Sequence, residues 1–321
     1  MFKNLIKTLS LIFFSLLIGI ILCEMILRIK HNFLINYDIE MWKYAKILKK
    51  KVENKKINHV HVIKKSANLQ KVEIKINNYG QRDINFTNQD LLKYDRRFLI
   101  LGSSVALGWG VDSKDTFSNF LNKKSINSDK KWIFINGGVG NYNAERYVNN
   151  YLENWKSLNF TDIIIHFFVN DSELIVASET NFFTENFHLG VVLWKLFNSY
   201  KSQFNQENIK EYYSQRFEDT YPGFIIAKQE IKNLMNHCKK QNINCHLILM
   251  PDIHKLSPYN LNFINKKMNQ FSQEIGISFF DLLPALQITD SKKLWNKYKD
   301  PHPNKYAHSI IGDAIFNYLN K

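Results

Sequence analysis

Short apolar runs alternate with amphipathic stretches from about residue 96 to the carboxyl terminus. Each run is followed by Gly, Asn, Pro or Asp, which is typical of buried strands in a parallel sheet. The predicted strands are 98–101, 132–136, 163–169, 246–250 and 277–280. Apolar positions at helical spacing predict helices at 115–124, 144–155, 224–240, 260–274 and 305–319. This alternation predicts an α/β fold, with helices on both faces of a mainly parallel five-stranded sheet.

The amino-terminal pattern is different, because residues 9–27 form one long apolar run whose only charge is Glu24. About 20 apolar residues are enough to span a bilayer core as a helix. No small-residue cleavage site follows the run, which favours an uncleaved membrane anchor over a signal peptide. Basic residues flank both ends of the run, so the flanking charge leaves the orientation open.

These patterns divide the chain into three parts. Residues 1–31 are the predicted transmembrane anchor, and residues 32–94 are a polar linker with a short β-containing extension. Residues 95–321 are the predicted α/β domain. Residues 172–220 lack a clear period, which predicts an insertion within that domain.

Composition narrows the class of protein. With 321 residues, of which 45% are hydrophobic, the chain is neither mostly disordered nor a small disulfide-stapled protein. The net charge of +14 comes mainly from lysines spread along the chain, which indicates diffuse surface charge rather than a nucleic-acid site. Cys238 and Cys245 are seven residues apart. Two interpretations of this pair stay open: a disulfide in an oxidising compartment, or two buried free thiols.

Polar residues with complementary chemistry stand at the ends of the predicted strands, where ligands bind in sheets of this kind. Ser104 follows the first strand, and Asp300 and His302 precede the last helix. A serine hydroxyl needs a base to attack a carbonyl, and His302 is the candidate base. Asp300 would hold the imidazole tautomer and stabilise the imidazolium. The sequence therefore predicts a Ser-His-Asp triad that forms an acyl-enzyme.

The tetrahedral intermediate of such a reaction carries an oxyanion, which needs preorganised hydrogen-bond donors. The predicted donors are the N–H groups of Ser104 and Gly140 and the side-chain amide of Asn170. Gly138 competes with Gly140 for the backbone role, because both follow the second predicted strand.

Four further residues near strand ends are candidate substrate contacts alongside Gly138. Trp109 and Tyr142 are candidates for stacking on a sugar ring, with ordinary packing as the alternative. Asp171 is a candidate contact that is also consistent with a structural role. His254, which follows the fourth strand together with Asp252, is a candidate for lining the pocket.

At these residues the sequence resembles the SGNH/GDSL hydrolase family. The four blocks of the family resemble LGSSVALGWGV (101–111), INGGVGNYN (135–143), FVND (168–171) and DPHPN (300–304). The resemblance covers about residues 95–321. It implies a flavodoxin-like three-layer α/β/α sandwich, no metal or organic cofactor, and hydrolysis or transfer of acyl esters.

The blocks depart from the family pattern at several positions. Ser103 stands where an Asp usually precedes the nucleophile, and it is the fallback nucleophile. Val169 replaces a Gly, and the acid lies at Asp300 in a D-x-H spacing rather than at Lys299. That spacing, the amino-terminal anchor and an N-x-x-G-x-R element that ends at Arg82 resemble membrane-anchored SGNH-like proteins of envelope polysaccharide acetylation.

The resemblance implies an esterase that acts on acyl esters, chiefly acetyl esters, of cell-envelope carbohydrate or a lipid-linked glycan. Two alternatives stay open. One is an O-acetyltransferase that uses the same triad and receives its acyl group from a membrane acyltransferase. The other is an inactive carbohydrate-binding protein. The implied location is a single-pass membrane protein with its catalytic domain on the periplasmic or outer side, and no nucleic-acid partner is expected.

Overall fold

A computed structural model describes residues 2–33, 39, 42, 61–64, 71–74, 76–174, 182–204, 209–296 and 302–321. The chain forms two compact units. The smaller unit consists of Met1–Tyr44, Ile63–Lys71 and Ala177–Gln206, and the larger unit consists of Ala45–Val62, Val72–Val176 and Glu207–Lys321.

The larger unit is built on a five-stranded sheet in which every neighbouring pair is parallel. The strand order is β4-β3-β5-β6-β7, which is the doubly wound order of flavodoxin-like folds. The predicted sheet is therefore confirmed. Its order reverses between β3 and β5, and ligands bind at that point in such folds. The strands are β3 (Arg96–Gly102), β4 (Trp132–Asn136), β5 (Asp162–Phe168), β6 (Asn244–Met250) and β7 (Ser278–Asp281).

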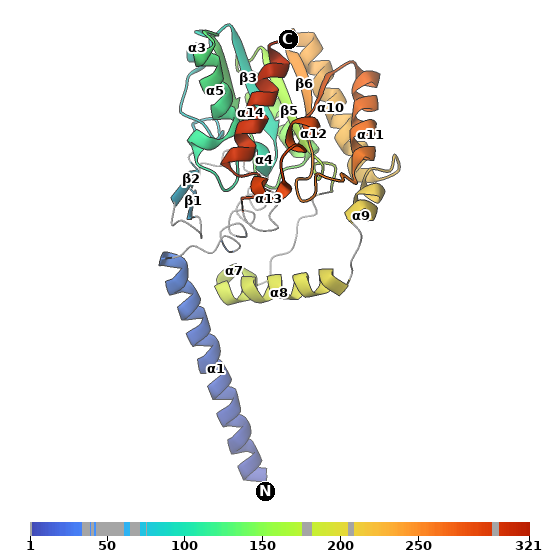
Figure 1. Ribbon diagram of the computed structural model, residues 1–321. Coiled ribbons are helices and arrows are strands. Elements are labelled where there is room, and N and C mark those ends of the chain that lie inside the picture. The colour runs from blue at the N-terminus through green and yellow to red at the C-terminus, as the bar shows by residue number, and fades with distance from the viewer. Residues whose placement is uncertain are drawn as a thin grey trace. The chain divides into compact units, whose positions relative to one another are not determined.

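Helices cover both faces of this sheet, so the unit has the predicted three layers (Figure 1). One layer pairs α5 (Phe117–Asn127) with α14 (Lys305–Leu319), and the other contains α6 (Ala144–Asn150), α10 (Pro222–Gln241) and α11 (Asn262–Ile275). The shorter helices are α3 (Asn88–Leu91), α4 (Ser104–Leu107), α9 (Ile209–Arg216), α12 (Leu283–Leu286) and α13 (Ser291–Leu294). A 3-10 turn at Ser113–Asp115, a π-helical turn at Tyr151–Trp155 and a two-stranded sheet of β1 (His61–Lys64) and β2 (Lys71–Ile74) complete the described elements.

The central strand β5 shows why the apolar runs form this sheet. All seven of its residues are buried, because helices cover both faces and leave no side of the strand exposed to water. His166 in the middle of β5 is completely buried, and desolvation lowers its pKa to about 4. This histidine is therefore neutral and packs in the core, where its ring stacks on Phe117.

The disulfide left open by the sequence is present in the structure. Cys238 near the end of α10 is bonded to Cys245 in β6, with 6.5 Å between their Cα atoms. The bond ties a covering helix to the strand that follows it along the chain.

The smaller unit contains α1 (Phe2–Phe33), α7 (Phe182–Asn186) and α8 (His188–Phe204). Residues Lys3–Phe33 of α1 are long and apolar enough to cross a membrane, with a mean hydropathy of 2.6. The middle of the predicted insertion belongs to this unit, because residues 177–206 group with α1. The predicted limits of the linker at 32–94 stay a prediction, since much of that segment lies outside the described residues.

Candidate active site

The predicted nucleophile and base lie together in the structure. Ser104 is the first residue of α4, directly after β3, and His302 lies just before α14. The Nε2 atom of His302 is 2.8 Å from the Oγ atom of Ser104. This is hydrogen-bond distance between a hydroxyl and a candidate base, across 198 positions of sequence.

Ser103 has different surroundings from Ser104. It is buried, and its Oγ atom has no hydrogen-bond partner among the described residues. Ser104 is half-buried and contacts the imidazole. Of these two adjacent serines, Ser104 is the one whose hydroxyl contacts the imidazole of His302.

Backbone pairing and one asparagine hold the His302 loop. The backbone N–H of Asn296 donates to the carbonyl of His302 at 2.9 Å. The side-chain amide of Asn304 donates to the carbonyls of Lys293 and Trp295. The amide oxygen of Asn304 also caps α14 by accepting two backbone N–H groups. One polar side chain therefore fixes both the loop that carries His302 and the helix that follows it.

The predicted acid, Asp300, lies outside the described residues, so its role stays a prediction. A second His–carboxylate pair is described after β6, where His254 Nδ1 is 2.8 Å from Asp252 Oδ1. The ring of His254 lies 6.2 Å from the ring of Trp295, and Trp295 is bridged to Pro303 beside His302. His254 therefore lies near the His302 loop and remains a candidate substrate contact.

The hydrogen bonds after β4 separate the two candidate glycines. The N–H of Gly138 donates to the side-chain oxygen of Asn136 at 3.0 Å, so it is occupied within the protein. Among the described residues, no acceptor takes the N–H of Gly140 or of Ser104. The N–H of Ser104 points out of the first turn of α4, as the first N–H groups of a helix do. Asn170 is exposed at the end of β5. These three groups are the ones available to hold an oxyanion.

Gly138 has a steric role in the site. A Cβ atom there would lie 2.2 Å from the backbone nitrogen of Leu107 and 2.6 Å from the carbonyl carbon of Ala106. Only glycine allows the chain after β4 to come this close to α4. Gly138 therefore sets how closely the chain after β4 approaches the helix that carries Ser104, and its predicted contact with substrate stays a prediction.

Two other predicted substrate contacts are enclosed in the protein. Trp109 is 1% exposed and its ring lies 6.5 Å from that of His302, so it packs behind the site instead of offering a face to a sugar. Asp171 is also 1% exposed, and its Oδ2 atom accepts the N–H of Phe168. Burial raises the pKa of Asp171 to about 8, which is consistent with a structural carboxyl group. Tyr142 is half-buried and keeps its candidate role.

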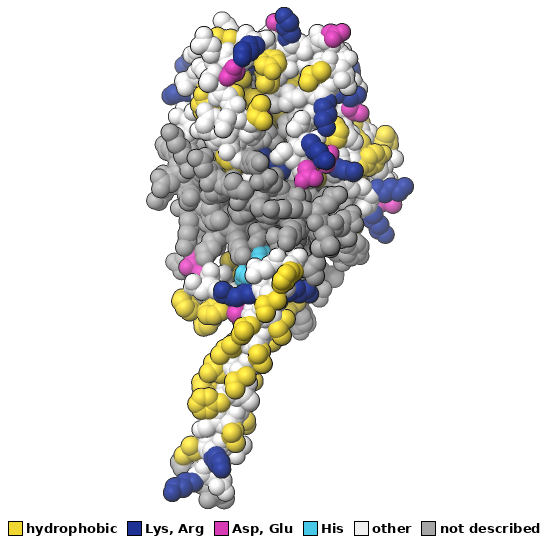
Figure 2. All heavy atoms as spheres, turned by 90° about the vertical axis from the view of Figure 1, so that its left-hand side faces the viewer, with side chains coloured by type: hydrophobic (Ala, Val, Ile, Leu, Met, Phe, Trp, Pro, Cys, Tyr) yellow, Lys and Arg dark blue, Asp and Glu magenta, His cyan; other side chains and the backbone are white. Residues whose placement is uncertain are grey.

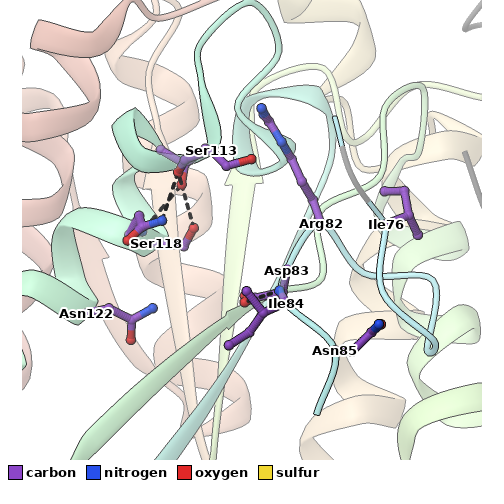
Figure 3. Close-up of a pocket in the computed structure, with 10 residues that line it drawn as sticks. Ile76, Arg82, Asp83, Ile84, Asn85, Ser113, Ser118 and Asn122 are labelled. Atoms are coloured by element: carbon purple, nitrogen blue, oxygen red, sulfur yellow. Dashed lines mark hydrogen bonds between the residues drawn. The ribbon is translucent and has the colours of Figure 1, made fainter. Parts of the chain in front are cut away.

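Arg82, from the N-x-x-G-x-R element, binds backbone carbonyls. Its guanidinium donates to the carbonyls of Leu107 at 2.8 Å, Gly108 at 2.6 Å and Val111 at 2.7 Å. These carbonyls end α4 and begin the following loop. Figure 3 shows the extended side chain of Arg82. Arg82 positions the nucleophile's helix from its far end.

A cavity of about 470 Å³ lies between residues 76–85 and the start of α5 (Figure 3). Asp83 lines it and accepts the N–H groups of Asn136 and Ile84. Burial raises the pKa of Asp83 to about 6. Asn122 bonds both backbone groups of Phe134. The polar groups that line the cavity are therefore largely hydrogen-bonded within the protein. The lining residues are Ile76, Arg82, Asp83, Ile84, Asn85, Ser113, Thr116, Ser118, Asn119 and Asn122.

Comparison with known proteins gives structural similarities without a family match. No family model and no curated protein sequence matches the chain. An acetylxylan esterase from Geobacillus stearothermophilus, solved as a catalytic mutant, has a TM-score of 0.47 at 13% identity, covering 72% of this chain and 97% of that one. A psychrotrophic esterase from Pseudoalteromonas sp. has a TM-score of 0.45 at 14% identity, covering 71% and 100%.

A third solved structure, described as a putative lipolytic protein of G-D-S-L family from Desulfitobacterium hafniense DCB-2, has a TM-score of 0.44 at 12% identity. It covers 70% of this chain and 99% of its own. The TM-scores of all three structures lie below 0.5.

Proposed function

We propose that this protein is a membrane-anchored serine esterase of SGNH type. The observation that carries the proposal is the 2.8 Å contact between Ser104 Oγ and His302 Nε2. The pair lies where β3 ends, beside the reversal of strand order. Such a pairing at the ligand-binding edge of a doubly wound sheet supports nucleophilic catalysis.

The chemistry follows from the positions of these groups. Ser104 Oγ attacks the ester carbonyl carbon while His302 Nε2 takes the hydroxyl proton. The oxyanion is received by the N–H groups of Ser104 and Gly140 and by the amide of Asn170. His302 then returns the proton to the leaving alcohol, and an acyl-enzyme remains on Ser104. Water attacks the acyl-enzyme with His302 again acting as base. Asp300 would orient the imidazole in each step.

For the substrate we propose an acetyl or other acyl ester of cell-envelope carbohydrate. Its support is the resemblance of the D-x-H spacing and the N-x-x-G-x-R element to anchored SGNH-like proteins. The apolar helix α1 would keep the enzyme at the membrane where such glycans are assembled. The Cys238–Cys245 disulfide favours the oxidising side of that membrane for the larger unit.

The test is turnover of p-nitrophenyl acetate by the full-length protein in detergent. Ser104→Ala should lower kcat by at least about 10³-fold, because no other group supplies the nucleophile. Ser103→Ala is the matched control, since that hydroxyl is adjacent but buried away from His302. We expect Ser103→Ala to retain turnover.

The same assay with an added sugar oligomer separates hydrolysis from transfer. Release of acetate with an unchanged oligomer mass supports the esterase. A gain of one acetyl group on the oligomer, dependent on Ser104, would replace the esterase by a transferase with the same triad. Turnover that survives Ser104→Ala would refute the assignment of the nucleophile.

A further inference from the structure

The smaller unit contains an apolar surface that the serine chemistry does not use. Helices α7 and α8 lie beside the carboxyl-terminal end of α1 and run across its axis (Figure 1). Their side chains present a group of large apolar residues to the outside. Each of the following is more than half exposed: Phe182, Phe183, Leu193, Leu196 and Phe197.

A carboxylate of α1 fixes α8 in this place. Glu24 accepts the backbone N–H of His188 at 3.0 Å and of Leu189 at 2.8 Å, the first two residues of α8. A negative side chain is stabilising at a helix amino terminus, where N–H groups lack partners within the helix. Arg28 completes the junction by binding Glu24 at 2.6 Å and the carbonyl of Asn186 at 2.7 Å.

Two ring contacts add to this junction. The ring of His31 lies 4.8 Å from that of His188, and the ring of Trp42 lies 4.6 Å from that of Trp194. The indole N–H of Trp42 also donates to the carbonyl of Thr184. The side chain of Trp42 therefore packs on α7 and α8, and the attachment of α8 extends beyond one side chain.

The height of this junction along α1 follows from helix geometry. A helix rises 1.5 Å per residue, so about 20 residues cover a hydrocarbon core of about 30 Å. Counting from Leu9, the first residue of the apolar run, the core ends near Arg28, and Glu24 lies about one turn inside that end. Figure 2 shows the matching pattern, with dark blue side chains at the free end of α1 and yellow side chains along its length. Arg28 thus lies at the boundary between hydrocarbon and headgroups, where charged groups are tolerated, and Glu24 pairs with it from one turn away.

A helix that packs crosswise on α1 at this height lies in the plane of the membrane–water interface. The exposed positions Leu193 and Phe197 are four residues apart and so share one face of α8. Phe182 and Phe183 extend that apolar surface onto α7. Amphipathic helices bury such a face in the layer between headgroups and acyl chains. The apolar residues of α1 are exposed in the same unit as this face, which favours lipid over another protein as the occupant of both.

We propose that α7 and α8 form an interfacial membrane platform, docked on α1 through Glu24 and seated in the headgroup layer of the bilayer. This proposal rests on the membrane anchor of the proposed function and is independent of the serine chemistry. Together α1 and the platform would attach the chain to the bilayer by a span and by a surface helix.

The test places a bimane fluorophore on single cysteines of the full-length protein in phosphatidylcholine–phosphatidylglycerol vesicles that contain brominated lipid. The background is Cys23→Ser, because Cys238 and Cys245 are buried and bonded to each other. The platform probes are Leu193→Cys and Phe197→Cys. The reference inside the span is Leu16→Cys. Ile288→Cys is the matched control, an exposed apolar position in the larger unit.

We expect brominated lipid to reduce the emission at Leu193→Cys and Phe197→Cys nearly as much as at Leu16→Cys, and to leave Ile288→Cys unchanged. Quenching at Leu16→Cys without quenching at 193 and 197 would overturn the platform and leave the anchor standing. A blue-shifted emission at 197 without quenching would mean that protein covers this face, and would also overturn it. Absent quenching at Leu16→Cys would refute the anchor itself. Activity of these variants on p-nitrophenyl acetate reports the serine chemistry separately.

Discussion

At the scale of single residues, Ser103 and Ser104 show how one step along the chain changes chemistry. Ser103 is buried at the N-cap position of α4 without a side-chain cap hydrogen bond, whereas Ser104 begins α4 and contacts His302. Sequence could place a reactive serine here from the strand end and the four family-like blocks. Excluding the Gly138 N–H as an oxyanion donor needed the structure, because this group donates to the side chain of Asn136. An Asn directly before two glycines was the available signal.

The buried carboxyl of Asp171 gives a prediction about pH. Burial raises its pKa to about 8 in the folded protein, while an unfolded chain keeps a value near 3.9. Between these two values the folded state binds more protons than the unfolded state. The free energy of unfolding therefore falls as pH rises from about 4 to about 8, by at most about 1.4 kcal/mol per pH unit from this group.

Asp171→Asn should remove this contribution, because an amide does not titrate. We expect the variant to be more stable than the wild type at pH 8.5 and to approach it at pH 5, measured by urea unfolding of the full chain. Asp129→Asn is the control, an exposed residue with φ of 52°, a conformation that Asn also adopts. If the free energy of unfolding changed with pH in the same way for wild type and Asp171→Asn, the raised pKa of Asp171 would be contradicted.

At the scale of elements, the apolar runs predicted all five strands, because burial on both faces produces continuous apolar sequence. The predicted lengths of the strands were less accurate. β3 begins at Arg96, two residues before its apolar run, where Arg96 pairs with the buried Asp162 at 2.6 Å. The four-residue α4 has no period to detect. The helices of the insertion were missed because α8 exposes apolar residues that a soluble helix would bury.

Arg82 gives a prediction about the stability of the protein and the position of α4. Its planar guanidinium reaches three carbonyls at the end of α4 and in the next loop. A lysine ammonium is a single point and cannot span them. Arg82→Lys should lower the free energy of unfolding by roughly 3 kcal/mol, the scale of charge-assisted hydrogen bonds. It should also reduce kcat in the folded protein by loosening the helix of Ser104.

Arg97→Lys is the matched control for this measurement. Arg97 also donates to carbonyls, those of Asn159 and Tyr94, but at the amino-terminal end of β3. Its loss should lower stability and leave kcat of the folded protein unchanged. Melting curves and p-nitrophenyl acetate kinetics at a temperature where each variant is folded give both quantities. Equal kcat for Arg82→Lys and wild type would refute a positioning role.

At the scale of the whole molecule, the chain combines an α/β/α unit with a smaller unit built around α1. Sequence predicted the apolar anchor from its length and the α/β unit from its alternation of elements. It could not predict that residues 177–206 group with α1. That association depends on Glu24, a single charge in an apolar run, meeting the first N–H groups of α8.

The Cys238–Cys245 disulfide links stability to the compartment of the larger unit. A bond that closes a loop this short stabilises by roughly 2–3 kcal/mol. Cys245→Ser should therefore lower the melting temperature under oxidising conditions, and a reductant should lower that of the wild type to match. Cys23→Ser, at an exposed thiol in α1, is the control and should change nothing. Free thiols at 238 and 245 in protein isolated without reductant would contradict an oxidising location.

The central claim is that Ser104 is a nucleophile activated by His302. The most direct measurement is labelling of the full-length protein with a fluorophosphonate, followed by mass spectrometry of the peptides. We predict an adduct on Ser104 in the wild type and in Ser103→Ala, and its loss in His302→Gln. An adduct on Ser103, or labelling of Ser104 that does not depend on His302, would contradict the account.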